Sequence, residues 1–180
     1  MSEQKHAREL LILRHAKSAW DTDAAMDHDR PLAKRGKRDA KRIGNWLREQ
    51  ELMPDSILSS PALRAVQTTH AICETLHIDP QRVVWDERIY AATADSLLDL
   101  VRKRPERERI VLLVGHNPGL EHLILCLCGD AVEIPEGGKL LPTAALARLG
   151  VARKWNTLTK GSVTLRSITR PGSLPDPTAA

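Results

Sequence analysis

Short apolar runs alternate with helix-like segments along this chain, and the alternation limits the folds that it can adopt. The clearest run, residues 109–116 (RIVLLVGH), is continuously aliphatic, as in strands that are buried on both faces of a sheet. Between such runs, apolar residues recur at helical spacing. Strands are predicted at 10–13, 55–60, 82–85, 109–116, 144–150 and 162–168, and helices at 34–51, 61–76, 93–104 and 118–128. This order predicts an α/β fold, a single-domain three-layer α/β/α sandwich with a mostly parallel central sheet.

The domain is expected to span residues 9–170, because 180 residues suit one domain. Residues 1–8 are expected to be disordered or frayed, and residues 171–180 to form a fraying, Pro-rich C-terminal tail. No apolar run approaches the roughly 20 residues of a membrane helix, and the N-terminus carries no apolar signal segment. A cytoplasmic protein without a membrane partner is therefore expected.

The net charge of +4 is mildly basic, and the basic residues are dispersed. The densest segment, residues 33–42 (AKRGKRDAKR), is typical of a solvated helix face. Aromatic residues are not interleaved with it, so binding to nucleic acid is not expected. The cysteines lack the second ligand pair that a zinc site needs, so no metal site is expected. A phosphorylated or otherwise acidic substrate would suit this charge balance.

Reactive or cationic residues follow three of the predicted strands. Arg14 and His15 follow the first strand, Arg64 lies shortly after the second, and His116 and Asn117 follow the fourth. The carboxyl ends of parallel strands share one edge of a sheet, which is where such folds bind ligands. Taken singly, each arginine or histidine has an ordinary structural interpretation. Together, two arginines and two histidines at one edge indicate an anion site.

Four segments that carry these residues resemble the histidine phosphatase (phosphoglycerate-mutase-like) superfamily. They are LRHAKS (13–18), RPLAKRGKRDA (30–40), SSPALRAVQTT (59–69) and VGHNPGL (114–120), and they occur in the family's order. The short chain and its RHAKSxW…DRPL pattern look most similar to the SixA-type phosphohistidine phosphatases. The resemblance implies a phosphoglycerate-mutase-like fold and a phosphatase that works through a covalent phosphohistidine.

The resemblance also implies roles for individual residues. His15 would be the nucleophile, and Arg14 and Arg64 would hold the phosphoryl oxygens. His116 would donate a hydrogen bond, which is strongest if its ring is protonated. Glu87 would be the general acid, although it could equally be a surface residue. Phosphoryl transfer in such a site depends on positioning and charge, so no metal or other cofactor is required.

Further candidate contacts lie next to the nucleophile. Lys17 and Ser18 are expected at the rim of the site, and Asn117 is expected to bind substrate. Asp21 stands where the family has a phosphate-binding Asn. A carboxylate repels a phosphoryl group, so Asp21 is expected to orient a histidine, pair with an arginine or turn away.

Two neighbouring features complete the comparison with the family pattern. Ala16 replaces the Gly that usually follows the nucleophile, which keeps side-chain bulk small. The DHDRPL segment, with Asp27, Asp29 and Arg30, is interpreted as a local ion-pair and turn arrangement, with contact to the substrate as the alternative.

The segments between the motifs are short, which predicts an open site without a roof. Such a site favours a phosphohistidine presented by a partner protein, for example a phosphotransfer domain. Two alternatives remain: a phosphatase of a small phosphomonoester metabolite, and a catalytically inactive module that binds phosphate or a phosphoprotein. The second alternative predicts damage to the nucleophile or the clamp, whereas Arg14, His15, Arg64 and His116 are all present.

Overall fold

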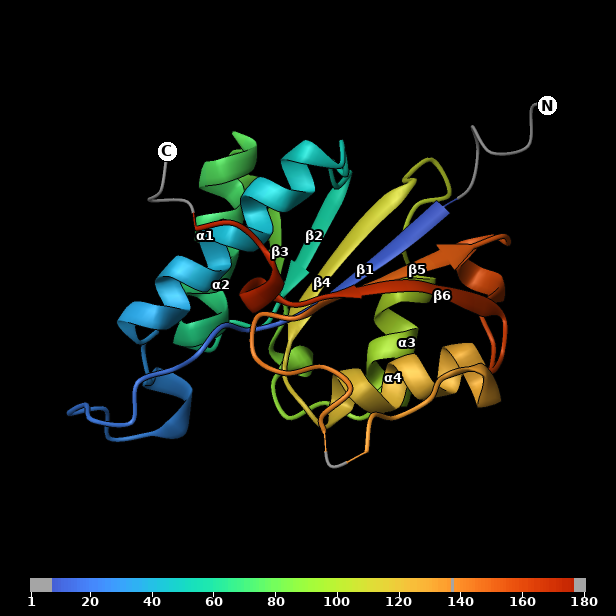
Figure 1. Ribbon diagram of the computed structural model, residues 1–180. Coiled ribbons are helices and arrows are strands. Elements are labelled where there is room, and N and C mark those ends of the chain that lie inside the picture. The colour runs from blue at the N-terminus through green and yellow to red at the C-terminus, as the bar shows by residue number, and fades with distance from the viewer. Residues whose placement is uncertain (1–7, 137, 177–180) are drawn as a thin grey trace.

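A six-stranded sheet lies at the centre of the protein, and its strand order is β3-β2-β4-β1-β5-β6 (Figure 1). The computed structural model describes residues 8–136 and 138–176. β1 to β4 are parallel, whereas β5 and β6 run antiparallel to them. The strands are β1 (Arg8–Arg14), β2 (Ser56–Ser59), β3 (Val83–Trp85), β4 (Ile110–Gly115), β5 (Leu146–Val151) and β6 (Val163–Thr169). The predicted three-layer fold with a mostly parallel sheet is confirmed.

Four helices cover the two faces of the sheet (Figure 1). The first two pack on one face and the last two on the other. They are α1 (Lys34–Glu49), α2 (Leu63–Leu76), α3 (Ala94–Arg102) and α4 (Gly119–Cys128). Short 3₁₀ helices lie at Asp27–Asp29, Pro80–Arg82, Glu87–Ile89, Gly129–Ala131, Trp155–Thr157 and Pro171–Ser173. Each predicted strand and helix is present, with its ends within two residues of those predicted. None of the helices in the described residues is long and apolar enough to cross a bilayer.

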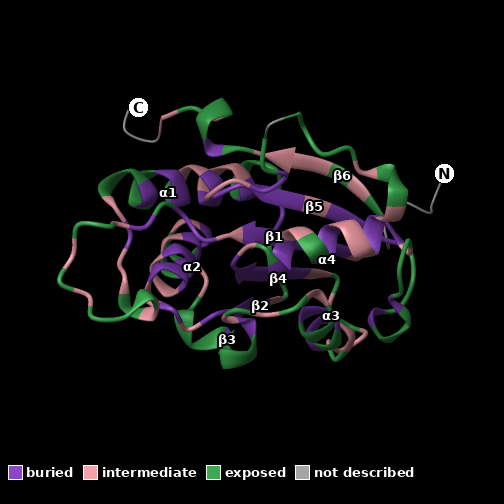
Figure 2. Ribbon diagram, turned by 90° about the horizontal axis from the view of Figure 1, so that it is seen from below, coloured by how far each residue is buried: buried purple, intermediate pink, exposed green. Residues whose placement is uncertain are grey.

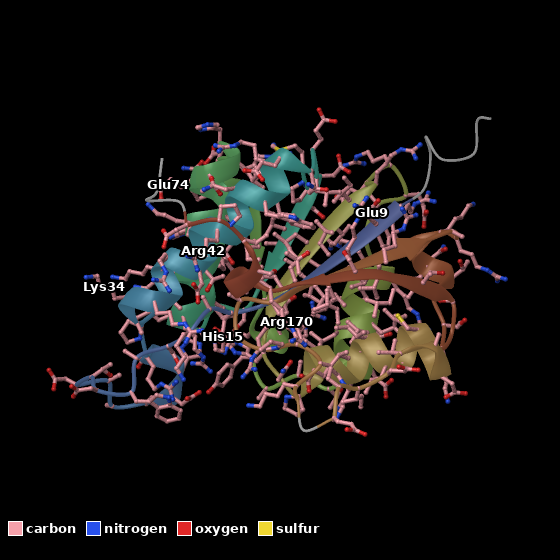
Figure 3. The ribbon with its side chains drawn as sticks, viewed as in Figure 1. Glu9, His15, Lys34, Arg42, Glu74 and Arg170 are labelled. Carbon is pink, nitrogen blue, oxygen red and sulfur yellow. The ribbon has the colours of Figure 1, made fainter. Side chains whose placement is uncertain are left out.

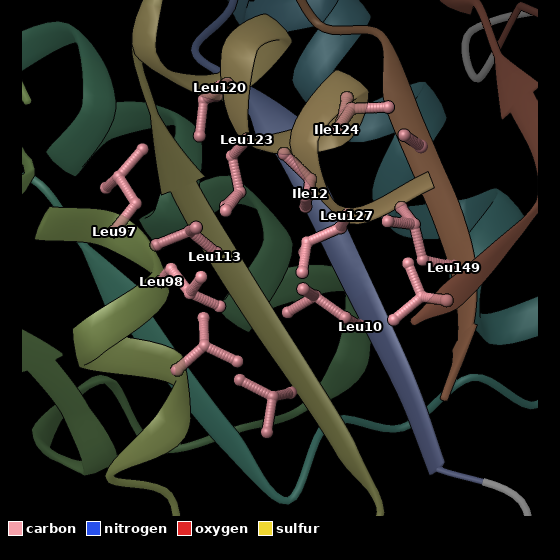
Figure 4. Close-up of a cluster of buried hydrophobic side chains, with 14 of the residues drawn as sticks. Leu10, Ile12, Leu97, Leu98, Leu113, Leu120, Leu123, Ile124, Leu127 and Leu149 are labelled. Atoms are coloured by element: carbon pink, nitrogen blue, oxygen red, sulfur yellow. The ribbon is translucent and has the colours of Figure 1, made fainter. Parts of the chain in front are cut away.

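Strand β1 shows why the apolar runs are continuous. Successive side chains of a strand point to opposite faces, so both faces of a central strand need apolar residues. Leu10 and Ile12 pack with α3 and α4, where they meet residues such as Leu123 (Figure 4). Leu11 and Leu13 pack with α1 and α2 on the other face. The burial colouring accordingly shows the central strands enclosed and β6 partly exposed (Figure 2).

The parallel strands end together at one edge of the sheet. Arg14 lies opposite Gly115, and Ser59 opposite Val114. Beyond the strands, the N–H of His15 donates to the carbonyl of Gly115 at 3.0 Å. The segments that follow β1, β2 and β4 are therefore held side by side by backbone hydrogen bonds.

The packed part of the chain extends beyond the predicted domain at both ends. Arg8, expected to be frayed, belongs to β1 and forms an ion pair with Glu106 at 2.9 Å. Residues 171–176, expected to fray as part of the tail, lie against α1. Pro171 is buried, and Asp176 pairs with Arg42 at 2.8 Å. The other residues expected to fray, 1–7 and 177–180, lie outside the described residues.

Gly36 fixes the start of α1 against the segment that follows the first strand. A Cβ atom at this position would lie 2.2 Å from the carbonyl oxygen of Lys17, a backbone atom that cannot move away cheaply. Gly36→Ala is expected to lower the free energy of unfolding in urea by roughly 1–3 kcal/mol, the usual effect of overpacking. Gly172→Ala is the control, because no described atom lies within 4 Å of a Cβ there. An equal loss of unfolding free energy in Gly36→Ala and Gly172→Ala would contradict the prediction.

Candidate active site

A pocket of about 440 Å³ opens at the carboxyl edge of the parallel strands. Figure 3 shows His15 beyond the end of β1, in the region where the strands meet the following segments. The pocket lining carries five basic side chains and a single carboxylate, so an anion is favoured there. The lining residues are Arg14, His15, Lys17, Ser18, Trp20, Asp27, Arg30, Arg64, His116, Asn117, Lys139, Pro142 and Thr143.

The ring of His15 is held in one tautomer. Its Nδ1 lies 2.8 Å from the carbonyl oxygen of Ala16, which only accepts hydrogen bonds, so Nδ1 carries the proton. Burial and the charges of Arg64 and Arg14 lower the pKa of His15 to about 4, although the Ala16 carbonyl opposes the shift. At neutral pH the ring is therefore uncharged, and Nε2 carries no proton.

The lone pair of His15 faces the cationic side of the pocket. The Nε–H of Arg64 donates to His15 Nε2 at 3.3 Å. An anion that binds Arg64 would therefore lie next to the unprotonated nitrogen. A neutral imidazole nitrogen beside a bound phosphoryl group is arranged for nucleophilic attack.

The titration of His15 gives a direct test of this arrangement. We expect ¹⁵N NMR to show neutral His15 with the proton on Nδ1 from pH 8 down to near pH 4, because burial disfavours the charged ring. Protonation should occur only as the pH falls through about 4. His15→Ala identifies the resonances by their loss. A midpoint near the ordinary value of 6.5 would contradict the prediction.

Arg64 is fixed by Asp27 as well as by His15. Its Nη1–H donates to the backbone carbonyl of Asp27 at 2.6 Å, and its Nη2–H donates to the Asp27 carboxylate at 2.9 Å. The Tyr90 hydroxyl donates to the same carboxylate at 3.0 Å. Partial burial alone would raise the pKa of Asp27, but the Tyr90 hydrogen bond and the Arg64 charge outweigh it and lower that pKa. Asp27 is therefore ionised and holds Arg64 in place.

His116 lies beside His15, with 5.0 Å between the centres of the two rings. Its Nε2 is 2.8 Å from the Ser60 hydroxyl oxygen, which also accepts the N–H of Ala62 at 3.2 Å. Burial, together with the His15 ring and the charge of Arg64, lowers the pKa of His116 to about 3. Its Nδ1 is buried and has no hydrogen-bond partner among the described residues.

Arg14 and Asn117 are tied to the loop before β5. The Arg14 Nη1–H and the Asn117 Nδ2–H both donate to the carbonyl oxygen of Leu141, at 3.3 Å and 2.9 Å. The N–H of Leu141 in turn donates to the Glu121 carboxylate at 2.9 Å. This loop therefore borders the pocket and positions one of its arginines.

The rim of the pocket is formed by the segment after His15. Ser18 accepts a hydrogen bond from Arg30, whose guanidinium also lies 3.7 Å from the ring centre of Trp20. Arg30 pairs with the Asp27 carboxylate at 3.3 Å, so the DHDRPL segment does contain a local ion pair. Trp20 is three-quarters exposed despite its size. Lys17 is also exposed.

The pocket brings together most of the residues that the sequence singled out. Seven of them line it: Arg14, His15, Lys17, Ser18, Arg64, His116 and Asn117. Asp21 is exposed and is not part of the lining. Glu87 also lies outside the lining, with a side chain that is 79% exposed and a carboxylate 4.0 Å from His28 Nε2. Neither carboxylate lines the pocket that contains His15.

Asp27 is the main site residue whose place the sequence did not reveal. The sequence pattern groups it with Asp29 and Arg30 in a turn, whereas its carboxylate and carbonyl reach across to Arg64 on α2. The available signal was an acidic residue three positions before Arg30 in a segment of the family pattern. Lys139, from the loop before β5, gave no such signal and also lines the pocket.

Comparison with known proteins agrees with this geometry. The family model of the histidine phosphatase superfamily (branch 1) matches residues 10–90. The phosphohistidine phosphatase SixA of Escherichia coli is 30% identical over 122 residues, which are 67% of this chain and 74% of that protein.

Two solved structures extend the similarity over the whole fold. A SixA-type protein from Agrobacterium tumefaciens is 30% identical, with a TM-score of 0.77 over 91% of this chain and 98% of that one. The protein histidine phosphatase SixA complexed with tungstate is 25% identical, with a TM-score of 0.77 over 91% of this chain and 97% of that one. Together with the site geometry, these matches support phosphatase activity, and the chain belongs to the histidine phosphatase superfamily.

Proposed function

We propose that this protein is a phosphohistidine phosphatase that removes the phosphoryl group from a histidine on a partner protein. The observation that carries the proposal is the state of His15. Its Nδ1 donates to the Ala16 carbonyl, so its free Nε2 faces Arg64 within a cationic pocket. A buried neutral nitrogen beside a guanidinium is suited to attack a bound phosphoryl group.

In the first step, His15 Nε2 attacks phosphorus while the bond between phosphorus and the substrate nitrogen breaks. Arg14 and Arg64 neutralise the equatorial oxygens, whose charge is spread over the transition state. We assign to His116 a hydrogen bond to the phosphoryl group, donated by its neutral ring, because it lines the pocket next to His15.

The chemistry of the leaving group makes a phosphohistidine a better substrate for this site than an ester. A phosphohistidine ring that is protonated on its other nitrogen leaves as neutral imidazole, so the step needs no general acid. An alkoxide needs a proton donor. Glu87 is outside the pocket lining, and Asp27 is inside it but has a lowered pKa, so it is a poor donor. A general-acid role for Glu87 stays a prediction that would require its segment to move.

In the second step, water attacks the phosphorus and phosphate leaves His15. The His15 ring carries a proton on Nδ1 while it carries the phosphoryl group on Nε2, so it is cationic and leaves as neutral imidazole. The hydrogen bond to the Ala16 carbonyl keeps that proton in place. The same hydrogen bond thus prepares the nucleophile for the first step and the leaving group for the second.

Two further observations support this substrate class. A similar structure, that of the protein histidine phosphatase SixA, contains tungstate, an oxyanion with the tetrahedral shape of phosphate. The pocket rim is formed by exposed side chains, Lys17 and Trp20, so a side chain on another protein has access. The partner is expected to be a phosphotransfer domain, and the cytoplasmic location remains a prediction.

A side-by-side turnover assay tests the proposal. The purified protein would receive a histidine-phosphorylated phosphotransfer domain and a panel of small phosphomonoesters, with His15→Ala as the control. We expect phosphohistidine to be cleared far faster than any ester, and only by the wild type. A small ester that is hydrolysed faster by a wide margin would assign the site to a metabolite. No turnover of any substrate by folded protein would instead indicate a binding module.

A further inference from the structure

Helix α1 carries an unusual excess of positive charge beside the pocket. Seven of its 16 residues are basic, and two, Asp39 and Glu49, are acidic. The basic residues are Lys34, Arg35, Lys37, Arg38, Lys41, Arg42 and Arg48. Packing explains the amphipathic pattern of the helix, but it does not explain why its exposed side is basic rather than mixed.

The arginines next to the buried Asp39 have partners. Arg35, Arg38 and Arg42 lie 3.3, 3.7 and 3.6 Å from the Asp39 carboxylate. Their charges are therefore partly used in holding the helix together. They offer less to a ligand than unpaired cations would.

The lysines form a separate row, the lysine stripe, which consists of Lys34, Lys37 and Lys41. Positions i, i+3 and i+7 lie on one side of a helix, and all three residues are exposed. Lys41 lies 3.6 Å from Glu74 on α2. Within the described part of the chain, Lys34 and Lys37 have no carboxylate at ion-pair distance. Figure 3 shows Lys34 at the start of α1, extending outward from the sheet.

The lysine stripe begins at the pocket. The N–H of Ala33 donates to the carbonyl oxygen of Lys17 at 2.9 Å, and Lys17 itself lines the pocket. With a rise of about 1.5 Å per residue, the stripe extends about 10 Å along α1 from Lys34. A protein whose phosphorylated side chain entered the pocket and whose surface extended over the start of α1 would meet Lys34 first and Lys37 next.

A groove accompanies the far part of the stripe. It has a volume of about 250 Å³ and lies between α1 and α2. Its lining residues are Lys37, Lys41, Gln67, His70, Ala71 and Glu74. Glu74 is paired with Lys41, whereas Lys37 has no carboxylate at ion-pair distance among the described residues. The surface thus offers both charge and a concave shape to an acidic side chain.

We propose that the lysine stripe docks an acidic surface of the phosphorylated partner protein. The inference rests on the proposed function, since it assumes that the phosphohistidine in the pocket is carried by that partner. Charge complementarity of this kind mainly raises association rates and selects partners. The pocket recognises the phosphoryl group, which every phosphorylated partner shares, and the stripe distinguishes acidic partners from others.

The test compares two fluorescent peptides, each with one phosphohistidine. One carries Asp and Glu around it, and the other carries Asn and Gln at the same positions. Binding is measured by anisotropy with His15→Ala protein, which leaves the phosphoryl group intact. We expect the acidic peptide to bind about tenfold more tightly at low salt, and the difference to disappear at high salt, where exposed charges are screened.

Charge reversal locates the effect. In the same background, Lys34→Glu with Lys37→Glu is expected to remove the preference, while binding of the neutral peptide changes less than about twofold. Acidic residues favour the first turn of a helix, so α1 should still fold. The matched control is Lys154→Glu with Lys160→Glu, an equal charge change at exposed positions outside the pocket and the groove.

Three results would overturn the proposal. The first is equal affinity of the His15→Ala protein for both peptides at low salt, and the second is a loss of the preference for the acidic peptide to the same extent in the Lys154→Glu, Lys160→Glu control. The third result is tighter binding of a single-stranded RNA than of an acidic peptide with the same charge. Turnover of the neutral peptide by protein with intact His15 is measured separately. Failure of the docking surface is thereby distinguished from failure of the phosphatase reaction.

Discussion

Replacing His15 with alanine is expected to lower turnover of a phosphohistidine substrate by at least about 10⁴-fold, the scale seen when a nucleophile is removed. The variant loses His15 Nε2, the unprotonated nitrogen that lies next to Arg64 in the pocket. His116 does not replace it, because its Nε2 lies 2.8 Å from the Ser60 hydroxyl and its Nδ1 is buried. Samples quenched in alkali, where the nitrogen–phosphorus bond is stable, should accordingly contain phosphorylated wild-type protein and no phosphorylated variant.

Anion binding separates loss of chemistry from loss of the site. The five basic residues of the pocket lining do not include His15, so His15→Ala should still bind tungstate or vanadate within about tenfold of the wild type. Calorimetry measures this affinity, and circular dichroism checks the fold. Substantial turnover in a folded variant would show that another group is the nucleophile. Loss of both binding and turnover would point to a collapsed pocket instead.

The sequence was sufficient to predict the sheet and one edge of the site. Continuous aliphatic runs such as residues 109–116 identify strands buried on both faces, and the residues just after such strands converge wherever the strands are parallel. Arg14, His15 and His116 lie within one residue of a strand end, so their meeting follows from topology. The place of Arg64 could be predicted too, because Pro61 comes soon after β2 and Arg64 therefore belongs to the first turn of α2.

The sequence could not place residues whose positions depend on loops. Asp27 belongs to a 3₁₀ helix between β1 and α1, and its contact with Arg64 spans 37 residues. Glu87 also lies in a 3₁₀ helix. In such a short turn, neighbouring residues point in different directions, so a shift of one position changes whether a side chain points toward the pocket or toward solvent. Asp86, its neighbour, turns back to pair with Arg88 at 2.6 Å. The apolar periodicity of the sequence does not predict these side-chain directions.

The loop before β5 illustrates the same limit. Its place beside the pocket depends on Leu141, whose carbonyl accepts from Arg14 and Asn117 and whose N–H donates to Glu121. These are backbone contacts of an apolar residue, so the identity of Leu141 says nothing about them. A Pro-containing and Gly-containing loop could have crossed the sheet edge elsewhere with the same composition.

Arg64→Ala is the second large expected effect, a loss of roughly 10²–10³ in kcat/KM, which corresponds to about 2.7–4 kcal/mol of transition-state stabilisation. Arg64 is buried and directs its Nε–H at the attacking nitrogen, so its charge acts where charge develops. Steady-state kinetics with a phosphohistidine peptide measures the loss. Arg64→Lys should recover only part of it, because an ammonium group lacks the planar fork that holds two oxygens.

Asp27→Asn distinguishes a direct role of Arg64 from one that depends on its ion pair. The amide keeps the size of the side chain and still accepts from Arg64, while the competing negative charge is removed. Because Asp27 acts on Arg64 and not on the reacting atoms, its loss should cost less than about tenfold in kcat/KM and act mainly through KM. An Arg64→Ala effect below tenfold would place Arg64 outside the reaction. If Asp27→Asn were as damaging as Arg64→Ala, the carboxylate itself would have to take part in the reaction.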